Sequence, residues 1–225
     1  CVKKSFIKNF KKKEKYFVNL KTKKQTHPMR VLEYEIKGKT KKTIIINAHN
    51  CHKYQANDDI SGCAVGIRIF EYLKTKKKLK YSYRLLIAPE LFGPMFWLKK
   101  VNKKNIIGAI LLKAVGNSSK IKLQNSFNAK SLLDHAAENA LKNLKIDFQK
   151  GGFREIYGND ETVFEAPGNN IPSITLTRFP FKQYHTDQDK PKFIKEKNLV
   201  DTFEILKKSF DILEKNLDVS NSHKG

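Results

Sequence analysis

The chain has 225 residues, enough for one well-buried core, and its 40% hydrophobic and 11% aromatic content is typical of a folded globular protein. No apolar run reaches about 18 residues, so we expect no membrane-spanning helix. The formal net charge is +23, but 40 of the 45 basic residues are scattered lysines. Because base readout and phosphate forks favour arginine, we expect no specific nucleic-acid partner, only non-specific attraction to polyanions at low salt. An acidic polymer or a sugar phosphate stays open as substrate or partner.

The sequence of the N-terminal region predicts two strands and does not have the pattern of a signal peptide. Residues 16–20 and 30–36 alternate apolar and polar side chains, which predicts an antiparallel pair at one margin of a sheet. The chain starts at Cys1 without a Met, and no apolar h-region follows. We therefore expect one domain over residues 1–225, cut from a longer protein. The three cysteines form no disulfide framework, which favours a reducing cytoplasm.

A buried strand is predicted where four β-branched residues follow one another at 43–46. Ligand-type side chains come after this strand and before a predicted helix over 60–73, namely His49, His52, Asp58 and Asp59. Strand ends are where open α/β sheets build their sites, and imidazoles and carboxylates can hold a divalent metal. Alternatively, the carboxylates cap the helix and the histidines lie on a solvated loop.

Two later strands deliver similar side chains. The strand predicted over 83–89 is followed by Glu90, and the strand predicted over 171–177 leads into a loop with Tyr184 and His185. A catalytic metal site needs a few protein ligands, an open position for water and a nearby carboxylate. The three strand ends together therefore predict such a site.

The remaining periodic segments complete an alternation of strands and helices, with no internal repeat and no interdomain linker. This alternation predicts an α/β fold, a three-layer sandwich around a mixed central sheet. The further segments are helices over 94–101, 129–144, 161–165 and 195–217, and a strand within 105–115.

The ordered motifs resemble a known family. TIIINAHNC, ANDDISG and PELFG are similar to the H-x-D, A-D-D-N-x-S-G and E-E-x-G motifs of zinc aminopeptidases and glutaminyl cyclases. The set HNCHKYQANDDISG, YSYRLLIAPELFG, NDETVF and YHT is more similar to a bacterial aminopeptidase-like family of unknown function, often labelled with polysaccharide biosynthesis. The resemblance covers roughly residues 1 to 200, and the order of the motifs makes it more specific than any one of them.

The resemblance implies a zinc-dependent hydrolase that cleaves an amide or peptide bond in a peptide or a small molecule. Zinc would be held by His49, His52, Asp58 and His185. Which of the two histidines of the first loop, His49 or His52, binds the ion stays open. Glu90 would take a proton from the metal-bound water and pass it to the leaving amine.

Three further residues would support this site. Asp160 or Glu161 would order it or bind the substrate's amine, and Tyr184 would orient His185. The alternative role of the two acidic residues is to cap the helix that follows them.

The chain departs from the aminopeptidase pattern at three positions. Cys51 stands where the family has a carboxylate, Leu91 replaces a second glutamate, and Lys113 (or Ala114, if the register slips by one) replaces an aspartate ligand. Two ligands of a two-metal site are thus missing, so we expect one zinc ion, with His52 in place of the lost glutamate. Lys113 could place its ammonium where the second cation would be, but we favour a solvated lysine at a strand end.

Two other classes of function stay open. One is an amidase or acyl-transfer enzyme acting on a sugar or a cell-surface precursor, which would use the same metal and base. The other is a non-catalytic scaffold that kept the fold. Zinc content after purification separates an enzyme from a scaffold, whereas the substrate and the oligomeric state do not follow from the sequence.

Overall fold

Seven strands form one mixed sheet in the computed structural model, which describes residues 4–216. The order is β1-β3-β2-β4-β7-β5-β6. The neighbours β3, β2, β4 and β7 are parallel, β1 is antiparallel to β3, and β5 is antiparallel to β7. The strands are β1 Leu32–Ile36, β2 Thr43–His49, β3 Ser82–Ala88, β4 Ile106–Lys113, β5 Lys122–Gln124, β6 Gln149–Gly151 and β7 Ser173–Thr177.

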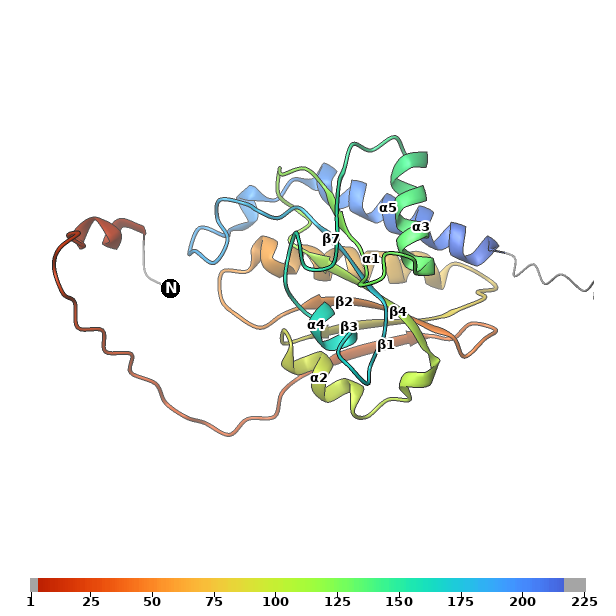
Figure 1. Ribbon diagram of the computed structural model, residues 1–225, viewed down its shortest axis with the longest axis horizontal. Helices are drawn as coiled ribbons and strands as arrows, with labels where there is room; N and C mark the ends of the chain where they lie inside the picture. The colour runs from red at the N-terminus through yellow and green to blue at the C-terminus, as the bar shows by residue number, and fades with distance from the viewer. Residues whose placement is uncertain (1–3, 217–225) are drawn as a thin grey trace, which may run out of the picture.

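Helices cover both faces of the sheet, so the predicted three-layer α/β sandwich is confirmed. Figure 1 shows α1, α3 and α5 on one face and α2 and α4 on the other. The helices are α1 Ser61–Lys74, α2 Phe92–Leu98, α3 Leu132–Asn143, α4 Glu161–Phe164 and α5 Glu196–Lys215. Shorter helical turns occupy Lys4–Asn9, Ala56–Ile60, Lys103–Asn105 and Pro191–Phe193.

The central strand β2 shows why the sequence takes this form. Ile44 and Ile46 pack into the core on the side of α1 and α5, whereas Ile45 packs into the core on the side of α2 and α4. All three side chains are fully buried, and each such burial contributes about 1.5–3 kcal/mol. A strand covered on both faces therefore needs the uninterrupted apolar run that the sequence has.

The prediction of a strand over residues 16–20 is wrong. Among residues 4–216 this segment pairs with no strand, and Phe17 is 93% exposed. In Figure 1 the chain before β1 runs away from the sheet. β1 pairs instead with β3, with Leu32 opposite Ile87, so alternation alone did not identify the partner. The three-residue strands β5 and β6 were not predicted, because they are too short to show a period.

The other predicted strands and helices are present, with ends displaced by a few residues. The helix predicted over 195–217 corresponds to α5, which ends at Lys215. Residue 216 is therefore outside the helix, and residue 217 lies outside the described residues. Cys51 and Cys63 are free thiols, and Cys1 lies outside the described part. Within residues 4–216, no helix combines the length and apolar character that a bilayer crossing requires.

Candidate metal centre and active site

The candidate site lies at the carboxyl ends of the parallel strands. His49 is the last residue of β2, Glu90 follows β3, and Lys113 is the last residue of β4. Because parallel strands end at the same edge of a sheet, these side chains are brought together with His185, which lies in the loop after β7.

Asp58 stands at the centre of three imidazoles. Its Oδ1 lies 3.1 Å from His49 Nε2, while its Oδ2 lies 3.5 Å from His52 Nε2 and 3.4 Å from His185 Nε2. The structure thus brings together all four residues for which the resemblance implies metal binding. Burial alone would raise the pKa of Asp58, but the three imidazoles outweigh burial and lower it.

Several atoms of this group have no hydrogen-bond partner within the described residues. They are both carboxylate oxygens of Asp58 and the Nε2 atoms of His49 and His52. A buried polar atom left unsatisfied costs about 1–3 kcal/mol, so their convergence needs an explanation. Two ligands of a tetrahedral zinc with bonds of 2.0–2.1 Å lie about 3.3 Å apart, close to the separations around Asp58. The residues present therefore fit a zinc ion.

Two overlapping groups of ligand atoms are close enough to share an ion. The atoms of His52, Asp58 and His185 lie within 4.8 Å of one another, and so do those of His49, Cys51 and His52. Zinc accepts nitrogen, carboxylate oxygen and thiolate sulfur, so both sets suit it chemically.

Backbone contacts hold the loop that carries Asp58. Asp189 accepts hydrogen bonds from the backbone N–H of Asn57 and of Asp58, at 2.9 and 3.0 Å. Asp189 is buried and was given no role from the sequence, because its partners are backbone groups that leave no residue pattern. The peptide bond between Asp58 and Asp59 is cis.

Asp59 lies behind His49, with its Oδ2 4.0 Å from His49 Nδ1, and ties three elements together. Its carboxylate accepts from the backbone N–H of His49 in β2, Gly62 in α1 and Ala114 after β4, at 3.0–3.2 Å. The helix-capping alternative thus applies to Asp59 and not to Asp58. Burial raises the pKa of Asp59 well above its ordinary value. A Cβ at Gly62 would lie 2.4 Å from Asp59 Oδ1, so this contact requires glycine.

Lys113 is fully buried, so the expectation of a solvated lysine is wrong. Its Nζ lies 3.0 Å from His49 Nδ1 and 3.1 Å from Asp160 Oδ2. Burial lowers the pKa of Lys113, but the carboxylates of Asp160 and Asp59 outweigh burial and hold it above the usual value. Burial, and after it the positive charge of Lys113, lowers the pKa of His49 to about 4. Its imidazole is therefore neutral at pH 7.

Asn159 contacts both Asp160 and Glu90, and its side-chain oxygen accepts from the backbone N–H of Asp160 at 2.7 Å. The side-chain amide of Asn159 donates to Glu90 Oε1, and Asp160 Oδ1 accepts from the backbone N–H of Leu91 at 2.6 Å. Burial raises the pKa of Glu90, and Asp160 and Asp58 add to the rise, against the opposing effect of Lys113. Asn159 was not predicted as a site residue, because an asparagine before two acidic residues is also an ordinary turn signal.

Asp160 and Glu161 are both buried, so their contacts are internal. Asp160 bridges Lys113 and the chain after β3, which fits the ordering role. Both oxygens of Glu161 accept from the backbone N–H of Asn159, which precedes α4, at 2.7 and 2.8 Å. Asp160, the N-cap residue of α4, makes no side-chain capping hydrogen bond, so of the capping alternative only the favourable charge of Glu161 in the first turn applies.

Tyr184 stacks on His185 with ring centroids 3.8 Å apart and planes inclined by 19°. Tyr184 itself packs edge-on against Tyr157 and Phe179. The histidine side chain is 58% exposed, so the stacked ring restricts its orientation on a side that the fold leaves open.

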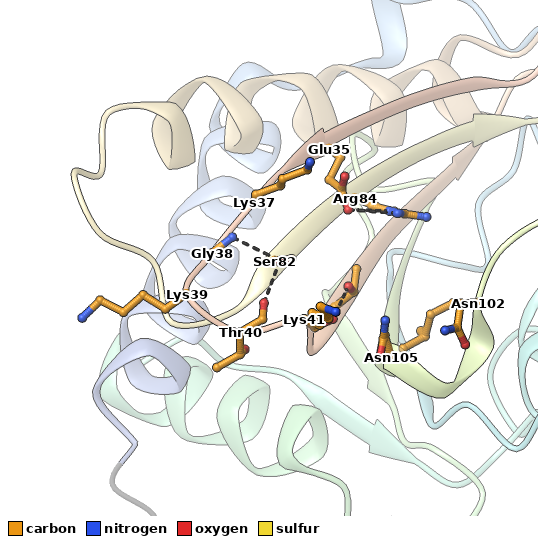
Figure 2. Close-up of a pocket in the computed structure, with 12 residues that line it drawn as sticks. Glu35, Lys37, Gly38, Lys39, Thr40, Lys41, Ser82, Arg84, Asn102 and Asn105 are labelled. Atoms are coloured by element: carbon orange, nitrogen blue, oxygen red, sulfur yellow. Dashed lines mark hydrogen bonds and ion pairs between the residues drawn. The ribbon is translucent and has the colours of Figure 1, made fainter.

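A separate hollow of about 270 Å³ lies at the opposite edge of the sheet. Figure 2 shows it beside the starts of β2 and β3, with Lys37, Lys39 and Lys41 around it and Arg84 paired with Glu35. None of the described residues that line it carries an imidazole or a thiol, so the candidate chemistry stays at the carboxyl ends of the strands.

Comparison with known proteins identifies the family and the fold of the chain. A Clostridium acetobutylicum protein, named for polysaccharide biosynthesis and an aminopeptidase-like domain, is 31% identical over 175 residues, which are 76% of this chain and 40% of that protein. A crystal structure from the same organism, named as that of a peptidase, has a TM-score of 0.78 at 28% identity and covers 83% of this chain and 44% of that one. The chain thus spans less than half the length of these relatives.

Two more distant structures share the fold. The zinc aminopeptidase BSAP of Bacillus subtilis has a TM-score of 0.70 at 17% identity, covering 81% of this chain and 49% of that one. The glutaminyl cyclase of Porphyromonas gingivalis has a TM-score of 0.71 at 20% identity, covering 83% of this chain and 77% of that one. Residues 22–216 match the model of a domain of unknown function, DUF4910. The chain therefore belongs to the DUF4910 family and has an aminopeptidase-like fold.

Proposed function

We propose that this chain is a zinc-dependent hydrolase that cleaves an amide or peptide bond, using one ion. The observation that carries the proposal is the meeting of Asp58 with three imidazoles, where buried ligand atoms lack other partners. Asp58, His185 and at least one of His49 and His52 would hold the ion. Bound zinc would supply a water of pKa about 7 and polarise the scissile carbonyl.

Glu90 is the proposed base. It stands at the end of β3, and Asn159 fixes one of its oxygens. A raised pKa keeps its carboxylate a better proton acceptor than an exposed glutamate, so it can take a proton from water and return it to the leaving amine. Asp160 orders this corner by holding the chain after β3 against Lys113.

The substrate side of the site is the side of His52, His185 and Glu90, which are partly or largely exposed, whereas His49, Asp58 and Asp160 are buried. We propose a peptide or an amide-bearing small molecule as the substrate. The free thiols Cys51 and Cys63 support the proposal of a reducing cytoplasm as the compartment.

A second candidate is an amidase or acyl-transfer enzyme acting on a sugar or cell-surface precursor. The name of the Clostridium acetobutylicum relative, which refers to polysaccharide biosynthesis, favours it. The same residues would serve, and only the bound substrate would differ.

The experiment is to strip the purified protein with a chelator, restore zinc, and assay aminoacyl amides and N-acylated amino sugars side by side. Hydrolysis that disappears with the metal and returns with zinc supports the proposal, and the preferred panel separates the two candidates. A protein that never binds zinc would instead be a non-catalytic scaffold. The replacement of two family ligands by Leu91 and Lys113 favours that alternative.

A further inference from the structure

We propose that Lys113 is a built-in cation that replaces a second metal ion, and that it makes His49 a positioning residue while His52, Asp58 and His185 hold the single zinc. The inference rests on the proposed zinc site and decides which residues form it. It also assigns a function to a buried lysine that the hydrolytic chemistry does not use.

The first step is the placement of Lys113. Its side chain is fully buried, and its Nζ contacts His49 Nδ1 at 3.0 Å and Asp160 Oδ2 at 3.1 Å. A buried lysine is kept only when it is paired, and here its carboxylate partner is equally enclosed. The ammonium therefore lies beside His49, and a cation bound at His49 Nδ1 would meet a like charge.

The second step is the tautomer of His49. An ammonium group can only donate hydrogen bonds, so His49 Nδ1 must accept with its lone pair. The proton of the neutral ring is then on Nε2, the nitrogen that lies 3.1 Å from Asp58 Oδ1, although the angle between the two groups falls outside hydrogen-bond geometry. A ring nitrogen that carries a proton has no lone pair for a metal. His49 is thereby assigned to orienting Asp58.

The third step is that the two carboxylate oxygens of Asp58 face different imidazoles. His49 faces Oδ1, whereas His52 and His185 both face Oδ2. The ligand atoms of His52, Asp58 and His185 lie within 4.8 Å of one another. Three protein ligands with a remaining open position are what catalytic zinc sites use. His52 and His185 are also the more exposed imidazoles, so the open position faces solvent.

The direct test follows the ring nitrogens by NMR in protein labelled with ¹⁵N-histidine, before and after one equivalent of zinc. His49→Gln, His52→Gln and His185→Gln assign the signals. We expect His49 to keep a protonated Nε2 and a bare Nδ1 in both states, while the Nε2 signals of His52 and His185 move to metal-bound positions. A His49 nitrogen that becomes metal-bound would overturn the inference while leaving the zinc hydrolase intact.

Zinc counting after dialysis gives an independent readout. The wild-type protein should hold one equivalent, and Lys113→Met should also hold one, because it removes the charge without adding a ligand. Lys113→Asp, which places a carboxylate at the strand end beside His49, should approach two. Two equivalents in the wild-type protein would overturn the inference. If either variant fails to fold by circular dichroism, the NMR experiment on the wild-type protein decides, and absence of any bound zinc would overturn the proposed function together with this inference.

Discussion

Asp58 and His185, which come from distant parts of the sequence, lie 3.4 Å apart between Asp58 Oδ2 and His185 Nε2. Neither residue belongs to a strand, but both follow strands of the parallel part of the sheet. Asp189 reinforces this meeting, because it lies in the same loop as His185 and binds the backbone of Asp58. The loop after β7 therefore closes onto the loop after β2 through two separate contacts.

Asp58→Asn should weaken zinc binding by at least about 100-fold. Loss of a residue that only hydrogen-bonds to a metal ligand typically lowers metal affinity about 10–100-fold, and loss of a ligand itself should lower it more. The amide keeps the shape of the side chain and removes its charge. Competition with a chromogenic chelator measures the affinity. Asp187→Asn, in the same loop as His185 but hydrogen-bonded to its neighbour Gln188, is the matched control and should bind zinc as the wild-type protein does.

The fold could be predicted from the sequence because the long elements carry strong periods. The buried run at Ile44–Ile46 and the amphipathic helices α1 and α5 identify the sandwich without any alignment. The strand predicted over 16–20 failed, since alternation says nothing about whether a partner edge is available. β5 and β6 escaped notice because three residues are too few for a period.

The candidate site was only partly predictable. His49, Asp58, Glu90 and His185 could be found because strand ends and motif order indicate them. The burial of Lys113 could not, since a lysine is normally solvated and its partner Asp160 lies on another element. The roles of Asn159 and Asp189 depend on contacts with a side chain and with backbone N–H groups far along the chain, which no local pattern encodes.

Gly62→Ala should destabilise the protein by about 1–3 kcal/mol or more, because the new Cβ would lie 2.4 Å from Asp59 Oδ1 and 2.7 Å from the backbone oxygen of Leu112. Urea unfolding measures the change. Gly66→Ala on the same helix is the control: its Cβ meets the flexible Leu85 Cδ1 at 2.9 Å, and alanine gains about 1 kcal/mol of helix propensity. Equal effects of the two variants would contradict the role of the Asp59 contact.

Glu165 should make stability fall as pH rises above its ordinary pKa of 4.5. Burial raises the pKa of Glu165 in the folded protein, although hydrogen bonds from Ser173 and Phe127 oppose the rise. Between 4.5 and the raised value the folded state binds more protons than the unfolded state, so the free energy of unfolding decreases with pH. Glu165→Gln should make this slope shallower in urea titrations, because buried carboxylates such as Asp59 and Glu90 contribute slopes of the same sign, while Glu71→Gln, on the exposed surface of α1, should leave it unchanged. A slope unchanged in Glu165→Gln would assign it to another group.

Glu90→Gln should keep zinc and lose hydrolysis by about 10²–10⁴-fold, the usual contribution of a general base. The amide retains the shape of the side chain and an oxygen that can accept from Asn159, so the local fold should persist. Glu71→Gln is the control and should change neither quantity. Zinc content and the rate with the best amide substrate are measured on the same samples. If zinc disappears together with activity, Glu90 is a ligand; if activity survives in full, the proton passes through another group. Only loss of activity with zinc retained fits a carboxylate that acts on the water from outside the metal's coordination.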